Sequence, residues 1–386
     1  MPDVFVVSDN ILSPLGLTTA ENFEQLTNNV SGIKEHDEPN MSTHPFYASL
    51  FDKNDGFIKK GDESIYTKFE QLLIASIRTA FENSGINTRD KKTILIISST
   101  KGNISLLETK MYNLSLQKRM ALHTSAKLVA EYFHFANEPV VVSNACISGL
   151  LAILVGMRLI QSGQYENAVI AGADVISKFV LSGFQSFQAI SDEPCKPFDQ
   201  ARSGITLGEG AGTIILSSQK RYARGIKVMG GSVSNDANHI SGPSRTGEEL
   251  AGVINKSLQE AKMVTSEIDF ISAHGTATLY NDEMEAKAIT LAGLQSVPVN
   301  SLKGYYGHTL GAAGLIESII SIHSLQENLV LPTRGFKQPG VEKPLNICRS
   351  LLHGTLQNCL KTASGFGGCN AAVVFGKSGT ILNYKN

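Results

Sequence analysis

The sequence predicts an α/β protein made of two similar halves, each with a largely parallel sheet covered by helices on both faces. Short β-branched runs alternate with segments of helical periodicity along the whole chain. The order of these segments in residues 1–217 returns in residues 218–386, which predicts a duplicated unit with these two halves as domains. Residues 150–160 are apolar nearly all round, as expected of a helix enclosed between two sheets.

The first half begins with a strand and a helix, followed by a polar, aperiodic stretch over residues 31–63 that we expect to leave the core. Short β-branched or apolar runs predict its strands at residues 4–8, 93–98, 140–142, 168–172 and 210–217. Helical spacing predicts its helices at residues 18–30, 66–84 and 104–135, the last of them irregular, and directly after Cys146. A loop is expected between the last two strands.

The second half repeats this order of strands and helices. Its strands are predicted at residues 226–234, 268–273, 297–300 and 371–376. Its helices are predicted at residues 249–261, 284–291 and 314–328.

Composition excludes several classes of protein. The chain has 386 residues, 42% hydrophobic and 18% charged, as in a folded protein of about two domains. Its net charge of −1 gives no general reason to expect nucleic acid or an anionic membrane as a partner. The five cysteines form no CxxC pair and no metal-ligand spacing, which favours a reducing compartment and predicts no metal site.

Targeting signals are also missing from the sequence pattern. The first ten residues have an acidic residue at position 3 and no basic region of the kind that begins a signal peptide. The longest apolar stretch is interrupted by Gly156 and Arg158 and is too short to cross a bilayer. We therefore expect a cytoplasmic protein that does not enter the membrane.

Cys146 lies where a strand turns sharply into the apolar helix. The run Val140–Val142 stops at Ser143, and the helix follows the cysteine. A sulfur at a helix N-terminus is favoured as a thiolate by unpaired N–H groups and by the helix dipole. Taken alone, a buried cysteine is more often a small core residue than a nucleophile.

Four further segments are bounded by glycine and carry chemically active side chains. They are residues 197–212, 274–289, 303–317 and 365–370. A dinucleotide site in residues 197–212 is disfavoured, because its glycines precede a strand instead of following one. His274, Lys303 and His308 fall with Cys146 at strand ends in corresponding places of the two halves, where α/β proteins form their sites. The pattern therefore favours shared chemistry over four unrelated structural residues.

As a set, six motifs resemble the β-ketoacyl-acyl-carrier-protein synthases of the elongating type. They are NILSPLG (10–16), NACISG (144–149), PFDQARSGITLGEGAG (197–212), HGTAT (274–278) followed by Asp282 and Glu285, LKGYYGHTLGAAG (302–314) and GFGGCN (365–370). The resemblance covers nearly the whole chain. It implies the thiolase fold, in which two halves pack as a five-layer α-β-α-β-α sandwich, and an acyltransferase that needs no cofactor.

The implied reaction is a decarboxylative Claisen condensation of an acyl group on Cys146 with malonyl-acyl-carrier protein. Both substrates arrive on the phosphopantetheine arm of the carrier. The resemblance implies that His274 and His308 act as neutral N–H donors to the developing enolate. It also implies that Lys303 pairs with Glu317 and orders the site.

Further residues are assigned by the same resemblance. The backbone N–H groups of Cys146 and Phe366 would form the oxyanion hole, and Phe366 would also be a gate hinged on its neighbouring glycines. Thr276 and Thr278 match positions that bind the pantetheine arm, although two strand-end hydroxyls also commonly cap a turn. Asp282 and Glu285 have supporting roles.

The acidic carrier protein is the expected partner, and its dock should be locally basic. Lys68, Lys118, Arg119 and Arg202 are the candidates for that patch. We expect a homodimer and leave open a heterodimer with a chain-length partner.

The chain departs from the family pattern at positions that shape the acyl pocket. Ser364 stands where an aromatic residue is usual, Cys369 replaces a threonine, and residues 31–63 and 100–125 form shorter stretches. Acyl length and pathway, whether fatty-acid elongation or a specialised polyketide or polyene-like route, therefore stay open.

Three other functions compete with this interpretation. A thiolase would use a second cysteine as its base, for which Cys369 is a candidate, but the two histidines and Lys303 favour decarboxylation. A non-catalytic chain-length subunit would lack the nucleophile that Cys146 supplies. An initiating synthase with a Cys-His-Asn set is disfavoured by His308.

Overall fold

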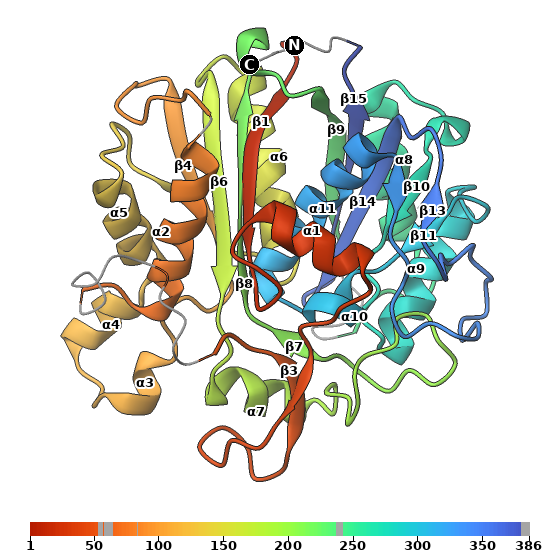
Figure 1. The fold of residues 1–386 in the computed structure, drawn as a ribbon, viewed down its shortest axis with the longest axis horizontal. Helices are drawn as coiled ribbons and strands as arrows, with labels where there is room; N and C mark the ends of the chain where they lie inside the picture. Colours follow the sequence, from red (N-terminus) through yellow and green to blue (C-terminus); the bar gives the residue numbers. More distant parts are fainter. Residues whose placement is uncertain (53–56, 58–64, 83, 237–241, 380–386) are drawn as a thin grey trace.

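Ten strands of the described chain form one mixed sheet that turns around two central helices (Figure 1). The computed structural model describes residues 1–52, 57, 65–82, 84–236 and 242–379. Starting at one edge, the strands of the first half are β5 (Val140–Val142), β4 (Thr93–Ser98), β6 (Asn167–Asp174), β8 (Gly210–Ser217) and β1 (Phe5–Leu12). The second half continues with β9 (Ile226–Asn235), β15 (Cys369–Lys377), β14 (Asn358–Gly365), β10 (Phe270–Ser272) and β11 (Val299–Asn300).

The two halves of the sheet have the same strand order and direction, counted outward from the seam between β1 and β9. In each half the inner strands pair antiparallel, whereas the outer strands pair parallel: β4 with β5 and β6, and β10 with β11 and β14. At the seam Phe5 pairs with Lys227, and the Val228 N–H donates to the Val4 carbonyl at 2.9 Å. This repetition fits a duplicated unit, and we keep the boundary between residues 217 and 218 as a proposal.

Helices on both faces of each half complete five layers. The central layer consists of α6 (Ser148–Gln161) and α11 (Ala313–Glu327), and the outer layers are α2 (Lys68–Phe81) with α5 (Leu122–Tyr132) and α8 (Glu248–Ala261) with α9 (Leu279–Leu291). Alternate strand residues serve the two sides: Ile94 and Ile96 join the central core, whereas Leu95 and Ile97 join the outer one. The predicted α/β class and five-layer sandwich are confirmed.

Central helices α6 and α11 pack unusually close to each other. A Cβ atom added at Gly149 would lie 2.7 Å from the Leu315 nitrogen, and one added at Gly314 would lie 2.8 Å from the Leu150 nitrogen. Both glycines are therefore needed for the contact that brings the halves together.

Two of the longer elements were not predicted. Helix α7 (Lys178–Ser186) forms inside the expected loop, with the Ser177 side chain accepting from the Val180 N–H as an N-cap. Strand β14 was missed because Lys361 interrupts its apolar run.

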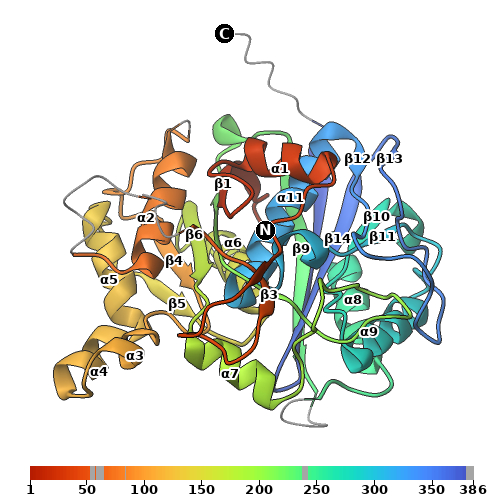
Figure 2. The same cartoon turned by 60° about the horizontal axis from the view of Figure 1, so that its bottom comes forward.

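The remaining elements are short. They are α1 (Thr19–Thr27), β2 (Lys34–His36), β3 (Phe46–Ser49), α3 (Leu106–Thr109), α4 (Leu114–Met120), β7 (Leu207–Gly208), η2 (Lys220–Tyr222), η3 (Thr265–Glu267), α10 (Lys303–Tyr306), η4 (Leu310–Ala312), β12 (Leu329–Val330) and β13 (Leu352–His353). The predicted excursion over residues 31–63 forms β2 and β3, which pair with β7 outside the main sheet, while residues 53–56 and 58–63 lie outside the described residues. Helices α3, α4 and α7 lie at one end of the molecule (Figures 1 and 2). Within the described residues, every helix is too short or too polar to cross a bilayer.

Candidate active site

The predicted strand–turn–helix around Cys146 is present. Ala145 has a left-handed backbone with φ of 45°, which turns the chain sharply between β5 and α6. The Ser148 hydroxyl accepts from the Asn144 N–H (2.7 Å) and donates to the Ala145 carbonyl (2.6 Å). These bonds hold Cys146 immediately before the first turn of α6.

The resting thiol of Cys146 differs from the expected thiolate. The pKa of Cys146 is raised to about 12, chiefly by burial and in part by the neighbouring Cys369 and Asp174, against the opposing effect of Lys303. The free protein therefore carries a protonated thiol, and the prediction of a preformed thiolate is wrong on this point.

The two histidines reach the site from separate loops. The backbone N–H of His274 donates to Glu285 Oε1 at 2.8 Å at the end of β10. The backbone N–H of His308 donates to the Thr206 carbonyl at 2.6 Å, beside β7. Gly208 in β7 makes this contact possible, because a Cβ atom there would lie 1.9 Å from the Tyr306 carbonyl oxygen.

Cys146, His274 and His308 converge. The Cys146 sulfur and one ring nitrogen of each histidine all lie within 4.8 Å of one another. The centroids of the two imidazole rings are 5.3 Å apart, and the ring planes are nearly perpendicular, at 81°. Burial, followed by the charge of Lys303, holds the pKa of both rings well below 6.5, so both are neutral at pH 7.

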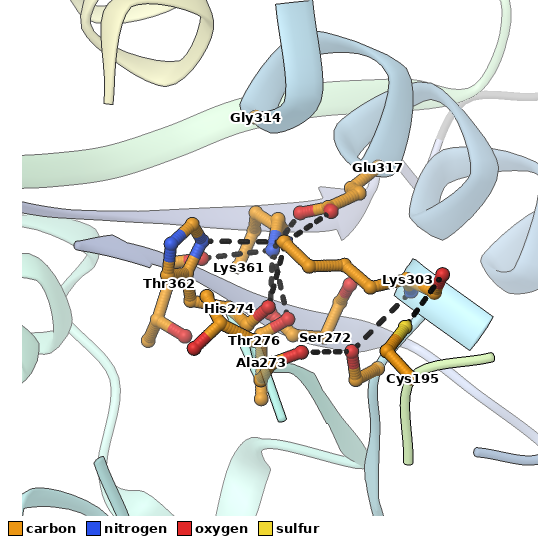
Figure 3. Close-up of polar contacts among 12 residues, drawn as sticks. Cys195, Ser272, Ala273, His274, Thr276, Lys303, Gly314, Glu317, Lys361 and Thr362 are labelled. Atoms are coloured by element: carbon orange, nitrogen blue, oxygen red, sulfur yellow. Dashed lines mark hydrogen bonds and ion pairs between the residues drawn. The ribbon is translucent and has the colours of Figure 1, made fainter. Parts of the chain in front are cut away.

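Lys303 and Glu317 form the predicted buried pair beside His274 (Figure 3). Lys303 Nζ donates to Glu317 Oε1 at 2.6 Å and to the His274 carbonyl at 2.7 Å, and lies 3.4 Å from His274 Nδ1. Lys361, which the sequence analysis did not select, lies 2.8 Å from Glu317 Oε2. Burial raises the pKa of Glu317, but the two ammonium groups outweigh it and leave that pKa below its usual value.

Asp282 and Glu285 hold the loop that follows His274. Asp282, fully buried, accepts from the backbone N–H groups of Thr276 (2.9 Å) and Ala277 (3.2 Å). Glu285 accepts from the His274 and Gly275 N–H groups, both at 2.8 Å. These carboxylates act on the backbone of the loop, as expected of supporting residues.

The two threonines of this loop lie together. Thr276 and Thr278 have their hydroxyl oxygens 2.9 Å apart, and the Thr278 hydroxyl also accepts from the Asn281 N–H as the N-cap of α9. The capping alternative therefore holds for Thr278, and a role in pantetheine binding remains a proposal.

The gate candidate lies in the turn between β14 and β15. A Cβ atom at Gly365 would be 3.0 Å from the Cys146 nitrogen, so this turn abuts the nucleophile. Phe366 is 40% exposed and packs on Phe184 and Phe187, with ring centroids 5.8 and 5.6 Å away. The Cys369 thiol donates to the Phe366 carbonyl (3.4 Å), which gives it a structural partner.

Two predicted docking residues hold buried carboxylates. Lys68 Nζ lies 2.7 Å from Glu209 Oε2, and the Arg119 guanidinium pairs with both oxygens of Glu70, which is fully buried. Lys118 is exposed in α4. Lys118 and Lys68, whose side chain is 42% exposed, are therefore the members of the predicted patch that reach solvent.

Arg202 does not reach the surface. Its side chain is 5% exposed, donates to the Asp199 carbonyl at 3.0 Å and lies 4.0 Å from Asp282. A guanidinium that binds internal carbonyls cannot dock another protein, so the prediction for Arg202 is wrong.

The donor set of Cys146, His274 and His308 is also one that soft metal ions accept in proteins. The Lys303 ammonium is 3.4 Å from His274 Nδ1, however, and its positive charge opposes a cation. The site is better suited to stabilise an anion.

Comparison with known families decides the identity of the fold and the enzyme class. Residues 1–221 match the family described as "Beta-ketoacyl synthase, N-terminal domain", and residues 226–337 match "Beta-ketoacyl synthase, C-terminal domain". The chain belongs to the β-ketoacyl synthase family. This synthase is a condensing acyltransferase, as the motifs predicted.

Relatives of the synthase come from two kinds of pathway. It is 31% identical to 3-oxoacyl-[acyl-carrier-protein] synthase 2 of Vibrio cholerae over 96% of this chain and 98% of the relative. It is 32% identical to the putative polyketide beta-ketoacyl synthase 1 of Streptomyces halstedii over 67% of this chain and 65% of the relative.

Solved structures share its fold. The ishigamide ketosynthase/chain length factor aligns with a TM-score of 0.90 at 25% identity, over 98% of this chain and 100% of that chain. A beta-ketoacyl synthase from Burkholderia phymatum aligns with a TM-score of 0.87 at 23% identity, over 98% and 100% of the two chains.

Proposed function

We propose that this synthase condenses an acyl group carried on Cys146 with malonyl-acyl-carrier protein, with His274 and His308 stabilising the enolate. The observation that carries the proposal is the convergence of one thiol and two neutral imidazoles within 4.8 Å. Two N–H donors beside a nucleophile meet the need of a reaction that forms a covalent intermediate and then an anion.

Acylation is a thioester exchange. The Cys146 sulfur bonds to the acyl carbonyl carbon, the bond to the pantetheine sulfur breaks, and the thiol proton ends on the departing pantetheine sulfur. The transient oxyanion is held by the backbone N–H groups of Cys146 and Phe366. Because the pKa of Cys146 is raised to about 12, the proton leaves as attack proceeds.

Decarboxylation follows on the malonyl group. The bond to its carboxylate breaks, carbon dioxide departs, and the electron pair forms an enolate whose oxygen accepts from His274 and His308. The enolate carbon attacks the acyl carbonyl, the bond from that carbonyl to the Cys146 sulfur breaks, and the expelled thiolate takes up a proton from water. Both imidazoles act in the neutral form, because their pKa values are well below 6.5, and each keeps its proton throughout the cycle.

The histidine roles are tested by separating the two half-reactions. We expect His308→Ala and His274→Ala to retain Cys146 acylation, measured by intact-protein mass spectrometry, and to lose at least about a hundredfold in malonyl decarboxylation. Cys146→Ala should abolish acylation. Failed acylation with intact decarboxylation in the histidine variants would overturn the assignment.

The substrates arrive on acyl carrier protein, and the chemistry needs no further cofactor. The full-length relative from Vibrio cholerae is named for such a carrier, which supports this partner. Thr276 and Thr278 line the approach of the pantetheine arm, Phe366 is the gate that admits the acyl chain, and Lys118 contributes to docking. The protein acts in the cytoplasm, where its five free cysteines stay reduced.

The proposed assembly is a homodimer. A chain-length partner is the alternative, because a structural relative is a ketosynthase/chain length factor. Mass spectrometry after exposure to a panel of acyl-carrier thioesters identifies the acyl group that Cys146 accepts and hence the pathway.

A further inference from the structure

Strand β14 carries a lysine whose side chain is fully buried. Lys361 lies opposite Ser272 in the register of β14 with β10. Its ammonium group donates to the carbonyls of Ser272 (3.1 Å), Ala273 (3.2 Å) and Thr362 (2.8 Å). Burying an ammonium group costs free energy that an apolar residue would avoid, so a lysine at this position calls for a role.

Lys361 shares a carboxylate with the lysine of the active site. Glu317 Oε2 lies 2.8 Å from Lys361 Nζ, and Glu317 Oε1 lies 2.6 Å from Lys303 Nζ (Figure 3). Two ammonium groups therefore share the two oxygens of one carboxylate. This trio leaves an excess of positive charge next to His274.

The contacts of Lys361 also lead directly to the catalytic loop. The carbonyls of Ser272 and Ala273 belong to the two residues that precede His274, while the His274 carbonyl itself is bound by Lys303 at 2.7 Å. The two lysines thus hold three consecutive carbonyls at the end of β10. A shift of this strand end would move the imidazole relative to Cys146.

Other charged and titratable groups face His274 as well. They are His308, Cys146, Lys303 from α10, Glu317 from α11 and Glu285 from α9. Glu285 accepts from the backbone N–H of His274 and from the side-chain hydroxyl of Thr362. Among these charged groups, the positive charges of Lys303 and Lys361 lower the pKa of both imidazoles.

We propose that Lys361 is a positioning residue for decarboxylation: it fixes the strand end that carries His274 and keeps a second positive charge behind the two imidazoles, where it favours the enolate. This inference rests on the proposed function of the site. Burial and Lys303 are the main causes that hold the pKa of both histidines below the usual value; Lys361 contributes next for His308, and after His308 for His274. Burial lowers the pKa of Lys361 itself, opposed by Glu317.

The test separates charge from hydrogen bonding at this position. Lys361→Gln keeps N–H donors without the charge, Lys361→Met removes both, and Lys361→Arg keeps the charge. Cys359→Ala is the matched control, because Cys359 is also buried in β14 and lies on the same face two residues away. Acylation of Cys146 and decarboxylation of malonyl-acyl-carrier protein are measured between about pH 5 and pH 9.

We expect the two neutral variants to decarboxylate about tenfold or more slowly, with acylation within about threefold of the parent. Their acid limb should move to higher pH, because both imidazoles protonate more readily without the Lys361 charge. Lys361→Arg and Cys359→Ala should keep the acid limb of the parent. An unmoved acid limb, or a parallel loss of both half-reactions with a lower Tm, would overturn the inference.

A measurement on the unmodified protein covers the case in which the neutral variants do not fold. NMR of lysine-labelled protein, with Lys361→Arg to assign the signal, reports the charge on Lys361. A protonated ammonium at pH 7 supports the inference, and a neutral amine overturns it. A parent protein that fails to decarboxylate malonyl-acyl-carrier protein would instead reject the proposed function.

Discussion

At the scale of single residues, burial acts in opposite ways on the nucleophile and on the groups that face it. It raises the pKa of the Cys146 thiol to about 12 and lowers the pKa of His274 and His308 well below 6.5. All three side chains are therefore uncharged at pH 7, although two buried ammonium groups lie beside them. The negative charge of the substrate therefore enters a site whose reacting groups are neutral and whose neighbouring lysine–glutamate trio carries an excess of positive charge.

This state of Cys146 predicts its reactivity. The rate of alkylation of Cys146 by iodoacetamide should rise about tenfold per pH unit between about pH 7 and pH 10, because only the thiolate reacts and its fraction grows with pH. Mass spectrometry after limited reaction identifies the modified cysteine and gives the rate. A rate that levels off near pH 7 would indicate a thiolate stabilised by the helix terminus and would contradict the raised pKa.

Residue types indicated much of the site from sequence alone. His274, His308 and Lys303 lie in glycine-bounded segments, and Cys146 follows a strand. Lys361 gave no such signal, because it interrupts an apolar strand and a lysine is normally a surface residue. The partners of its ammonium group, Glu317 and three backbone carbonyls, explain its burial, and the contact with Glu317 joins residues far apart in the sequence.

At the scale of elements, the contact between α6 and α11 positions the nucleophile relative to the second half. Helix α6 begins just after Cys146, and α11 carries Glu317. Both helices have a glycine where the other backbone approaches closely. Their separation therefore sets how far the thiol lies from the lysine network.

Gly314→Ala is expected to lower the free energy of unfolding by about 1–3 kcal/mol, because the added methyl group meets the Leu150 nitrogen at 2.8 Å. Gly252→Ala in α8 is the matched control, since nothing lies within 4 Å of its added Cβ atom, and it should stabilise the helix by up to about 1 kcal/mol. Urea unfolding measures both. Equal effects in the two variants would contradict the role assigned to close packing.

Periodicity predicted the long elements and missed those that depend on contacts. Strands such as β4 and β8 were predicted with their observed bounds because their apolar runs are uninterrupted. Helix α7 has only two fully buried residues, Val180 and Leu181, so its apolar pattern is short and was assigned to a loop. Arg202 was placed on the surface because no sequence pattern reveals that its guanidinium binds internal carbonyls.

At the scale of the whole molecule, large apolar side chains are exposed in and around α3, α4 and α7. Examples are Met111 between α3 and α4 at 90%, Leu114 in α4 at 75% and Phe187 just after α7 at 59% exposure. The Phe179 N–H donates to Glu108 Oε1 at 2.9 Å, which ties α7 to α3. These elements lie at the same end of the molecule (Figure 2), where an apolar surface favours a partner.

We expect light scattering to give a mass about twice the 41.5 kDa of the chain. Met111→Glu combined with Leu114→Glu should shift the mass toward that of one chain, because each charge would be buried in the interface. Val264→Glu, at an equally apolar position that is 62% exposed in the other half, is the control and should leave the mass unchanged. A single-chain mass for the parent, or a double variant that stays paired, would reject this interface.

The few bonds at the seam between β1 and β9 have a consequence for protein engineering. Because α6 and α11 cover one another, neither half has a closed interior when it is separated, even though the described strands of the main sheet pass from one half to the other only once, between β8 and β9. A synthase cut at that crossing should yield two fragments that misfold when expressed singly and recover turnover when expressed together. The two fragments would thus form a complementation pair, with the thiol on one fragment and both imidazoles on the other.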